Sequence, residues 1–249
     1  MSAGPTRWGS DPEFHGPRHS ARLSLIVRTL APHLAAGARV LDVGAGAGRL
    51  ANLLAARGCQ VTGIEPSEEF VAYARAHALP GASFERGAAE RLPYADGSFD
   101  AVVAGEVLEH LADDGVAVRE LWRVLAPGGV ALVTVPADPA LWDASDDWAG
   151  HVRRYAPGQL EQLFTAAGFA RVRVWRWGFP FLRLYHRRVY LPLLARKREA
   201  SAPAGPARRL ATAVLSGLFT LDRLFDGRGP GIGLLGLAFK PGEAVAPAP

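Results

Sequence analysis

A regular alternation of short β-rich runs and helical segments constrains the fold of this 249-residue chain more than any other sequence feature. Alternating strands and helices predict an α/β domain, a doubly wound, Rossmann-like sheet that is mostly parallel and covered on both faces. In such a sheet, ligands bind beyond the C-terminal ends of the strands. The expected strands are residues 40–43, 61–64, 82–85, 99–104 and 130–135.

The pattern changes in the last third of the chain. We expect a helix at 157–168, a strand at 170–175 and a final strand at 231–240. The intervening residues 177–230 are expected to be an insertion of two helices, split by a Pro/Ala/Gly-rich linker. The whole chain, 1–249, is predicted to be one domain. Its parts are a core at about 36–176 and 231–240, an N-terminal helical cap at 12–35 and the insertion at 177–230.

Composition bears on location and partners. The chain has one cysteine and no run of about 18 apolar residues, and its first residues do not resemble a secretory signal. We therefore expect a cytoplasmic protein. Residues 151–200 hold eleven Arg and Lys against two Glu, which favours contact with an anionic group. A solvated, arginine-rich face explains this excess equally well.

A glycine-rich turn, Asp42-Val43-Gly44-Ala45-Gly46-Ala47-Gly48, follows the first expected strand. Glycines at alternate positions let the backbone turn sharply and approach a ligand, and the next helix directs free amides toward it. Nicotinamide and flavin enzymes use a similar turn. Here Arg49 stands where their fingerprint needs its third glycine, which disfavours a nicotinamide oxidoreductase.

A single acid, Glu65, directly follows the second expected strand. A carboxylate at this place can accept hydrogen bonds from both hydroxyls of a ribose. An exposed loop acid is the alternative interpretation. Together with the glycine turn, Glu65 predicts a nucleoside-containing ligand.

With the segments 91–100 (RLPYADGSFD) and 125–129 (LAPGG), these motifs resemble the class I methyltransferases that use S-adenosylmethionine (SAM). The resemblance covers about residues 36–176. It implies a seven-stranded sheet whose last strand is antiparallel, with SAM as cofactor and the 88–90 turn facing its adenine. Many relatives have Asp at the position of Ala88, so that contact would fall to the backbone near Ala89. The cofactor-binding residues that it implies are Arg22, Asp42, Gly44, Ala45, Gly46, Gly48, Glu65, Pro66, Ala89 and Glu106.

A second constellation follows the fourth expected strand. If a helix starts near Gly105, then Glu106, Glu109 and His110 share one face and could bind Mg²⁺ or Mn²⁺. This E-x-x-E-H pattern resembles ubiquinone-pathway O-methyltransferases and enzymes that methylate the 3′-terminal ribose of small RNAs, where a further histidine completes the site. His151 is the candidate here. Without a metal, Glu106 would contact the cofactor and His110 would order the loop, or either histidine would act as a general base.

The leading hypothesis is methyl transfer to an oxygen of a small-molecule or lipid- or sugar-linked acceptor. Methylation of an RNA ribose 2′-oxygen and non-catalytic SAM binding remain alternatives, although no RNA-binding module is evident and a nucleic-acid partner is not favoured. The apolar stripe and the arginines of the insertion fit a lid, plain core packing or a peripheral membrane contact through residues 177–225. The oligomeric state stays open.

Overall fold

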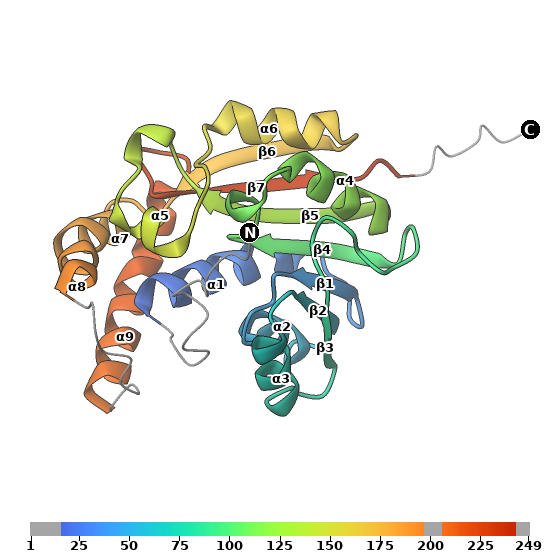
Figure 1. The fold of residues 1–249 in the computed structure, drawn as a ribbon, viewed down its shortest axis with the longest axis horizontal. Helices are drawn as coiled ribbons and strands as arrows, with labels where there is room; N and C mark the ends of the chain where they lie inside the picture. The colour runs from blue at the N-terminus through green and yellow to red at the C-terminus, as the bar shows by residue number, and fades with distance from the viewer. Residues whose placement is uncertain (1–15, 197–205, 243–249) are drawn as a thin grey trace, which may run out of the picture.

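The computed structural model describes residues 16–196 and 206–242. These residues form a seven-stranded sheet with helices on both faces (Figure 1). The strand order is β3-β2-β1-β4-β5-β7-β6. Only β7 runs antiparallel to its neighbours, so the expected mostly parallel sheet with an antiparallel last strand is confirmed. The strands are β1 (Arg39–Val43), β2 (Gln60–Glu65), β3 (Ala82–Arg86), β4 (Phe99–Gly105), β5 (Leu125–Pro136), β6 (Ala170–Trp177) and β7 (Gly233–Phe239).

Helices cover both faces of the sheet, with α4 and α6 on one side and α1, α2 and α3 on the other (Figure 1). Ser67 caps the N-terminus of α3, because its hydroxyl accepts the amide hydrogen of Phe70 at 3.3 Å. These elements are α1 (Pro17–Leu30), η2 (Ala31–His33), α2 (Arg49–Ala55), α3 (Glu68–Ala76), η3 (Leu108–His110), α4 (Asp114–Val124), η4 (Pro139–Leu141), α5 (Ala144–Ala149) and α6 (Pro157–Ala166).

The central strands are buried on both sides, which explains their unbroken apolar sequence. Successive side chains of a strand point to opposite faces, so Val40 of β1 joins the core under α1 and α2 while Leu41 joins the core under α4 and α6. Both side chains are fully buried. Two hydrophobic cores therefore hold the sheet in place and fix where its strands end.

The strand ends meet at one edge of the sheet. Val43 of β1 pairs with Ile64 of β2 and with Ala104 of β4, and Gly105 pairs with Thr134 of β5. The order of the strands reverses between β1 and β4, which is where such sheets bind ligands. A cavity of about 1640 Å³ opens there, as expected from the sequence.

Two local expectations were wrong. Residues 105–110 do not form a helix: Glu106 has a φ of +60°, its amide donates to the Thr134 carbonyl at 2.8 Å, and only the single 3-10 turn η3 follows. This continued pairing with β5 prevents a helical turn from starting at Gly105. The other error concerns β5, which begins at Leu125 rather than near Val130, because Leu125 pairs with Phe99 across a bulge.

The insertion covers one end of the cavity and contains more than the two expected helices. Its first half is one bent helical stretch, α7 (Phe181–Tyr185), the π-turn η5 (His186–Tyr190) and α8 (Leu191–Arg196). After the undescribed residues 197–205 come α9 (Pro206–Phe219) and the 3-10 segment η6 (Thr220–Phe225). α9 packs against α1, and the two helices lie side by side in Figure 1. Of the expected N-terminal cap, residues 12–15 lie outside the described chain.

Candidate active site

The glycine-rich turn between β1 and α2 forms one wall of the cavity. Gly44, Gly46 and Gly48 all have positive φ angles, +70°, +52° and +78°, which favour glycine. A Cβ on Gly46 would meet no atom within 4 Å. Gly44, Ala45 and Gly46 line the cavity, whereas Gly48 packs beneath the ring of Phe84 and does not. The turn therefore presents bare backbone to the cavity at Gly46.

Glu65 holds this turn to the start of α3. Its Oε2 accepts the Gly46 amide hydrogen at 3.0 Å, and its Oε1 accepts that of Ser67 at 3.0 Å. Burial raises the pKa of the Glu65 carboxyl, against these two hydrogen bonds. Each oxygen still has a lone pair, so the carboxylate can also accept hydrogen bonds from a ligand in the cavity. Pro66, the next residue, lines the same wall.

Two other acids that line the cavity carry buried carboxylate oxygens without a hydrogen-bond partner. They are Oδ2 of Asp42, at the end of β1, and Oε1 of Glu106, after β4. Burial raises the pKa of Asp42 to about 7, and the nearby charge of Glu65 adds to the shift. Both residues line the cavity. Unpartnered buried oxygens are costly, and a cationic ligand group between them would satisfy both.

Arg22 brings a cation to the same place from α1. Its guanidinium lies 3.5 Å from Oε2 of Glu106, and a second nitrogen lies 3.1 Å from Nδ1 of His19. The Arg22 side chain is 13% exposed and lines the cavity. The site therefore holds carboxylates and a guanidinium side by side, which suits a ligand that carries both an ammonium and a carboxylate.

The 88–90 turn also lines the cavity, and its first two residues, Ala88 and Ala89, have no polar side chain. Ala88 forms an isolated bridge with Arg91, and Ala89 is buried while still touching the cavity. The amide of Gly87 donates to the Glu65 carbonyl at 3.1 Å, which ties the turn to β2. Alanine at position 88 offers no polar side chain, so polar recognition at this turn falls to backbone groups.

The carboxylate of Glu109 lies close to two histidines, His110 and His151. The rings of His110 and His151 lie 4.9 Å apart, and Nε2 of His151 is 3.9 Å from Oε1 of Glu109. One ligand atom from each of the three residues lies within 4.8 Å of the others. The carboxylate of Glu109 is fully buried with both oxygens unpartnered, so burial and the charge of Glu106 raise its pKa well above the usual range. Glu106 faces Arg22 instead of completing this group.

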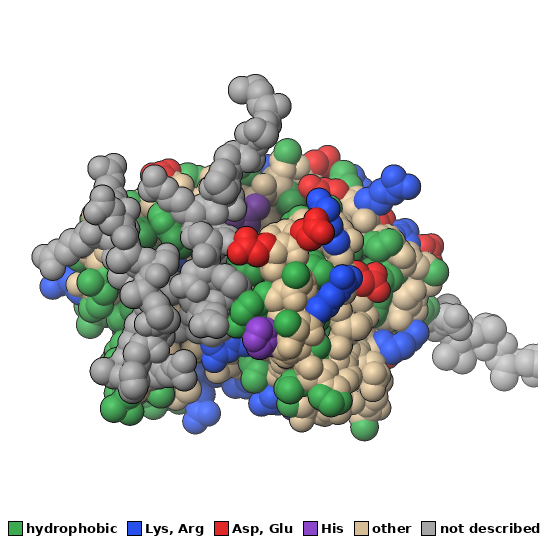
Figure 2. Space-filling view, turned by 60° about the horizontal axis from the view of Figure 1, so that its bottom comes forward, with side chains coloured by type: hydrophobic (Ala, Val, Ile, Leu, Met, Phe, Trp, Pro, Cys, Tyr) green, Lys and Arg blue, Asp and Glu red, His purple; other side chains and the backbone are tan. Residues whose placement is uncertain are grey.

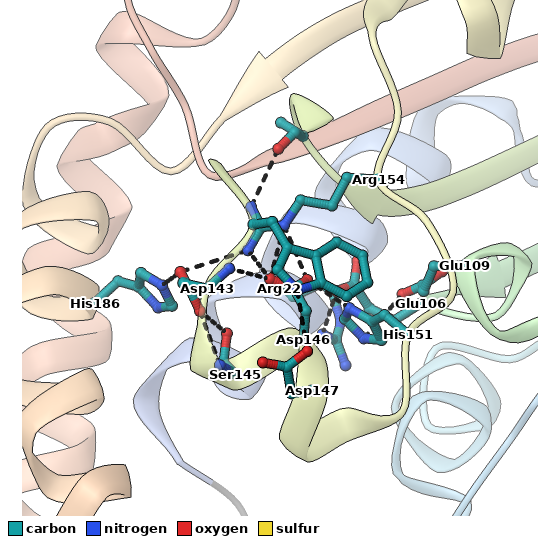
Figure 3. A network of polar contacts seen from close by, with 12 residues as sticks. Arg22, Glu106, Glu109, Asp143, Ser145, Asp146, Asp147, His151, Arg154 and His186 are labelled. Carbon is teal, nitrogen blue, oxygen red and sulfur yellow. Dashed lines mark hydrogen bonds and ion pairs between the residues drawn. The ribbon is translucent and has the colours of Figure 1, made fainter. Parts of the chain in front are cut away.

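Asp146, which sequence reasoning did not single out, orients His151 (Figure 3). Oδ1 of Asp146 lies 2.8 Å from Nδ1 of His151. The buried guanidinium of Arg154 donates to both oxygens of Asp146, at 2.6 to 2.9 Å. Burial opposes ionisation of Asp146, but the hydrogen bonds from His151 and Arg154 hold its pKa below the usual value.

The same network continues into the insertion. Nε2 of His186, in η5, lies 2.8 Å from Oδ2 of Asp143, which is also 3.5 Å from Arg154. Asp143 and Asp146 form the capping box of α5: a side-chain oxygen of Asp146 accepts the amide hydrogen of Asp143 at 2.8 Å, and the Asp143 side chain accepts that of Ser145 at 2.8 Å. The spacing Asp-x-x-Asp just before Gly150-His151 is the one sequence signal that could have identified this support.

Comparison with known proteins places these features in a family context. A family model described as a methyltransferase domain matches residues 41–133. A probable S-adenosylmethionine-dependent methyltransferase of Mycolicibacterium smegmatis is 37% identical over 139 residues, which cover 55% of this chain and 54% of the relative. A ubiquinone biosynthesis O-methyltransferase of Xanthomonas oryzae pv. oryzae is 40% identical over 131 residues, 49% of this chain and 53% of the relative. The chain thus spans about half the length of these curated relatives.

Solved structures share the fold over most of the chain. The [4+2]-cyclase SpnF has a TM-score of 0.64 and 29% identity, and the similarity covers 90% of this chain and 82% of the cyclase. Phosphoethanolamine N-methyltransferase 2 of Haemonchus contortus, solved in complex with S-adenosyl-L-methionine, also has a TM-score of 0.64, with 20% identity, covering 95% of this chain and 56% of that structure. The second likeness shows the fold alone.

Proposed function

Because this chain belongs to the class I SAM-dependent methyltransferases, we propose that it transfers a methyl group from SAM to an oxygen of a small-molecule or a lipid- or sugar-linked acceptor. The observation that carries the proposal is the pair of unpartnered buried carboxylate oxygens, on Asp42 and Glu106, beside the bare backbone of Gly46. SAM has an ammonium, a carboxylate and a ribose, and the groups around this wall fit all three.

In the proposed site, Asp42 and Glu106 face the ammonium and Arg22 faces the carboxylate. Glu65 accepts hydrogen bonds from the ribose hydroxyls, as its position after β2 supports. Gly44, Ala45 and Gly46 allow close approach, Gly48 shapes the turn from behind, and Pro66 and Ala89 contact the adenosine. Bound SAM supplies a methyl group already activated by its sulfonium, so the protein's main task is to position the acceptor in line.

The acceptor would occupy the rest of the cavity. Its volume of about 1640 Å³ exceeds the roughly 300–1,000 Å³ of ordinary small-molecule sites, which leaves room for a sizeable acceptor beside the cofactor. The far end is mostly apolar, with Arg18 stacked on the Tyr190 ring at 4.3 Å. Leu191, Leu194 and Leu215 of the insertion line this end. An acceptor with an apolar part fits such walls.

His151 and His110 are the proposed groups for removing a proton from the acceptor hydroxyl, because both line the cavity. Burial lowers the pKa of His110, with the neighbouring His151 adding to the effect, which favours a neutral ring that can take a proton. The alternative is a divalent cation, Mg²⁺ or Mn²⁺, held by Glu109, His110 and His151, because a histidine nitrogen that binds a metal cannot also take up the proton. The arrangement supports Glu109 as a ligand more than Glu106, whose carboxylate faces Arg22.

Similarity to the [4+2]-cyclase supports a second candidate, a protein that has the methyltransferase fold but performs another reaction. Two measurements separate the candidates. Calorimetric titration of the full chain with SAM tests the cofactor, with NADH as the control ligand. Assays for S-adenosylhomocysteine, using phenols with alkyl chains of increasing length as probes, test the transfer. SAM binding without S-adenosylhomocysteine from any probe would favour the second candidate, and absence of SAM binding would overturn the proposed methyl transfer.

A further inference from the structure

Exposed apolar side chains are concentrated on the insertion. Of the twelve large hydrophobic side chains that are exposed among the described residues, nine lie between residues 184 and 225. Scattered exposed leucines are normal, but a local group of them marks a binding surface. Figure 2 shows some hydrophobic side chains at the left edge of the molecule, on the side where α8 and α9 lie in Figure 1. The nine are Leu184, Val189, Leu193, Leu210, Val214, Leu218, Leu221, Leu224 and Phe225.

Five of these residues form one stripe along α9 and η6. Leu210, Val214 and Leu218 recur every four residues of α9, which places them on the same side of that helix, and the exposed Leu221 and Phe225 follow them in the 3-10 segment η6. The opposite side already packs inward through Leu215 and Phe219. A helix that covers a core normally turns polar residues outward, so a second apolar side on α9 requires another explanation.

The charges around this stripe have one sign. Every exposed charged side chain that the structure describes between residues 181 and 230 is an arginine: Arg187, Arg188, Arg223 and Arg228. The two acids that the structure describes in this region are already engaged. Asp222 is buried and accepts the amide hydrogens of Phe181 and Leu182 at 2.9 Å, and Asp226 pairs with Arg28 at 2.8 Å. The surface is thus apolar and cationic together.

The same helices line the outer end of the cavity. Leu191, Leu193 and Leu194 of α8 and Ala211 and Leu215 of α9 contribute to its wall. Leu193 is also 44% exposed, so apolar surface continues from the cavity to the outside of the insertion. None of the described helices is long and apolar enough to cross a bilayer.

We propose that the outward side of α8, α9 and η6 binds the surface of an anionic lipid bilayer. The apolar stripe enters the boundary between head groups and acyl chains, and the arginines contact lipid phosphates. In this orientation the cavity faces the lipid, so an acceptor with an apolar tail can pass into the site without crossing water. This last step rests on the proposed function, whereas the docking itself does not.

The combination of features favours lipid over other anionic partners. A nucleic-acid surface would neutralise the arginines but leave the exposed Leu210, Val214 and Leu224, each more than 60% exposed, in water. Another copy of this chain could cover the stripe, but it would bring the same arginines and thus like charges into contact. Only a bilayer offers negative head groups and an apolar interior at once.

The docking can be tested by sedimentation of the full chain with vesicles. We expect co-sedimentation with phosphatidylcholine vesicles that contain phosphatidylglycerol, and little with phosphatidylcholine alone. Val214→Ser with Leu221→Ser should lower the partition coefficient by about ten-fold or more, because two apolar anchors are lost. Arg187→Gln with Arg188→Gln should weaken binding to the anionic vesicles and reduce its sensitivity to salt. The matched control is Leu79→Ser, since Leu79 is 45% exposed but lies outside the insertion.

Calorimetric titration with SAM should give the wild-type dissociation constant for all these variants, which separates loss of docking from loss of fold or cofactor binding. Equal binding of the Val214/Leu221 variant and the wild type would overturn the proposal, as would absence of wild-type binding to anionic vesicles. Analytical ultracentrifugation tests whether a second copy of the chain covers the stripe instead. If the wild type is a dimer and the Val214/Leu221 substitutions dissociate it, the stripe is a dimer interface and the proposal is overturned. Preferential binding of a single-stranded RNA over the vesicles would overturn the proposal too.

Discussion

Nδ1 of His151 lies 2.8 Å from a carboxylate oxygen of Asp146, inside a clamp formed by the buried guanidinium of Arg154. Because Asp146 is held ionised, it can only accept, so Nδ1 carries the proton. The other ring nitrogen, Nε2, lies 3.9 Å from Oε1 of Glu109. Such an orientation suits both a metal ligand and a proton acceptor.

Asp146→Asn should therefore impair the proposed reaction through His151. We expect activity to fall about 10–100-fold, as for other residues that orient a functional histidine, while SAM binding is retained. Nitrogen-15 NMR of the histidine rings should show the proton of His151 on Nδ1 in the wild type and a mixture in the variant. The matched control is Asp143→Asn, because Asp143 contacts Arg154 and His186 but not His151. An unchanged His151 spectrum in Asp146→Asn would contradict this role.

Gly46→Val should abolish SAM binding, because its side chain would enter the cavity where the backbone is now bare. The positive φ of Gly46 adds a folding cost of about 1–2 kcal/mol. Gly128→Val is the matched control: Gly128 has a φ of +78° and open space around it, but does not line the cavity. Both variants should lose similar stability in urea, and only Gly46→Val should lose SAM in calorimetry. Retained SAM affinity would argue against this placement of the cofactor.

Glu65→Ala should weaken SAM binding by about 1.5–3 kcal/mol, the usual contribution of a hydrogen bond to a charged group. Part of the loss reflects freeing the amides of Gly46 and Ser67, which Glu65 now binds. Glu68→Ala is a suitable control, since Glu68 is an exposed acid three residues away that pairs with Arg86 at the surface. A dissociation constant for SAM equal to that of the wild type would remove Glu65 from the site.

Asp42→Asn tests the pH dependence of stability. The pKa of Asp42 is about 7 in the folded protein against an ordinary value of 3.8, so the folded state keeps a proton that the unfolded chain releases. The wild type should therefore lose stability as pH rises from about 4 to about 7, and then level off. Asn cannot ionise. Over this pH window the free energy of unfolding of the variant should therefore rise relative to that of the wild type, by up to about 4 kcal/mol.

Urea unfolding of the ligand-free protein at pH 5 and pH 8 measures this gain, with the exposed Asp100→Asn as control. SAM should bind the Asp42→Asn variant more weakly, because the carboxylate facing the ammonium is gone. A stability difference that is the same at both pH values would show that Asp42 does not titrate as its burial implies.

Glu109→Gln tests the proposed metal. Replacing a buried carboxyl that has no partner with a neutral side chain of the same shape should stabilise the metal-free protein. The variant should lose Mn²⁺ binding in calorimetry and keep SAM binding. Glu106→Gln should retain most of the Mn²⁺ affinity, since Glu106 faces Arg22. Full enzyme activity in excess EDTA would argue against any metal in the reaction.

Local patterns predicted much of this fold, because the features that encode it are local. The apolar run of β1, the glycines after it and the alternation of later strands with helices were readable from short segments, whereas the antiparallel last strand was implied by the family resemblance. The position of Glu65 followed from the same logic, since it only requires knowing where β2 ends. By contrast, the assumption of a helix at residues 105–110 failed, because pairing of Glu106 with Thr134 is a contact between distant segments.

The sequence by itself thus determined the sheet, its glycine turn and the edge where a ligand would bind, because each depends on periodicity and backbone preference within about ten residues. Only the tertiary structure decided that Glu106 turns to Arg22, that Asp146 and Arg154 fix His151, and that one side of α9 stays exposed. These relationships join residues from separate elements. They depend on burial and on the direction of side chains, which packing sets and no local pattern records.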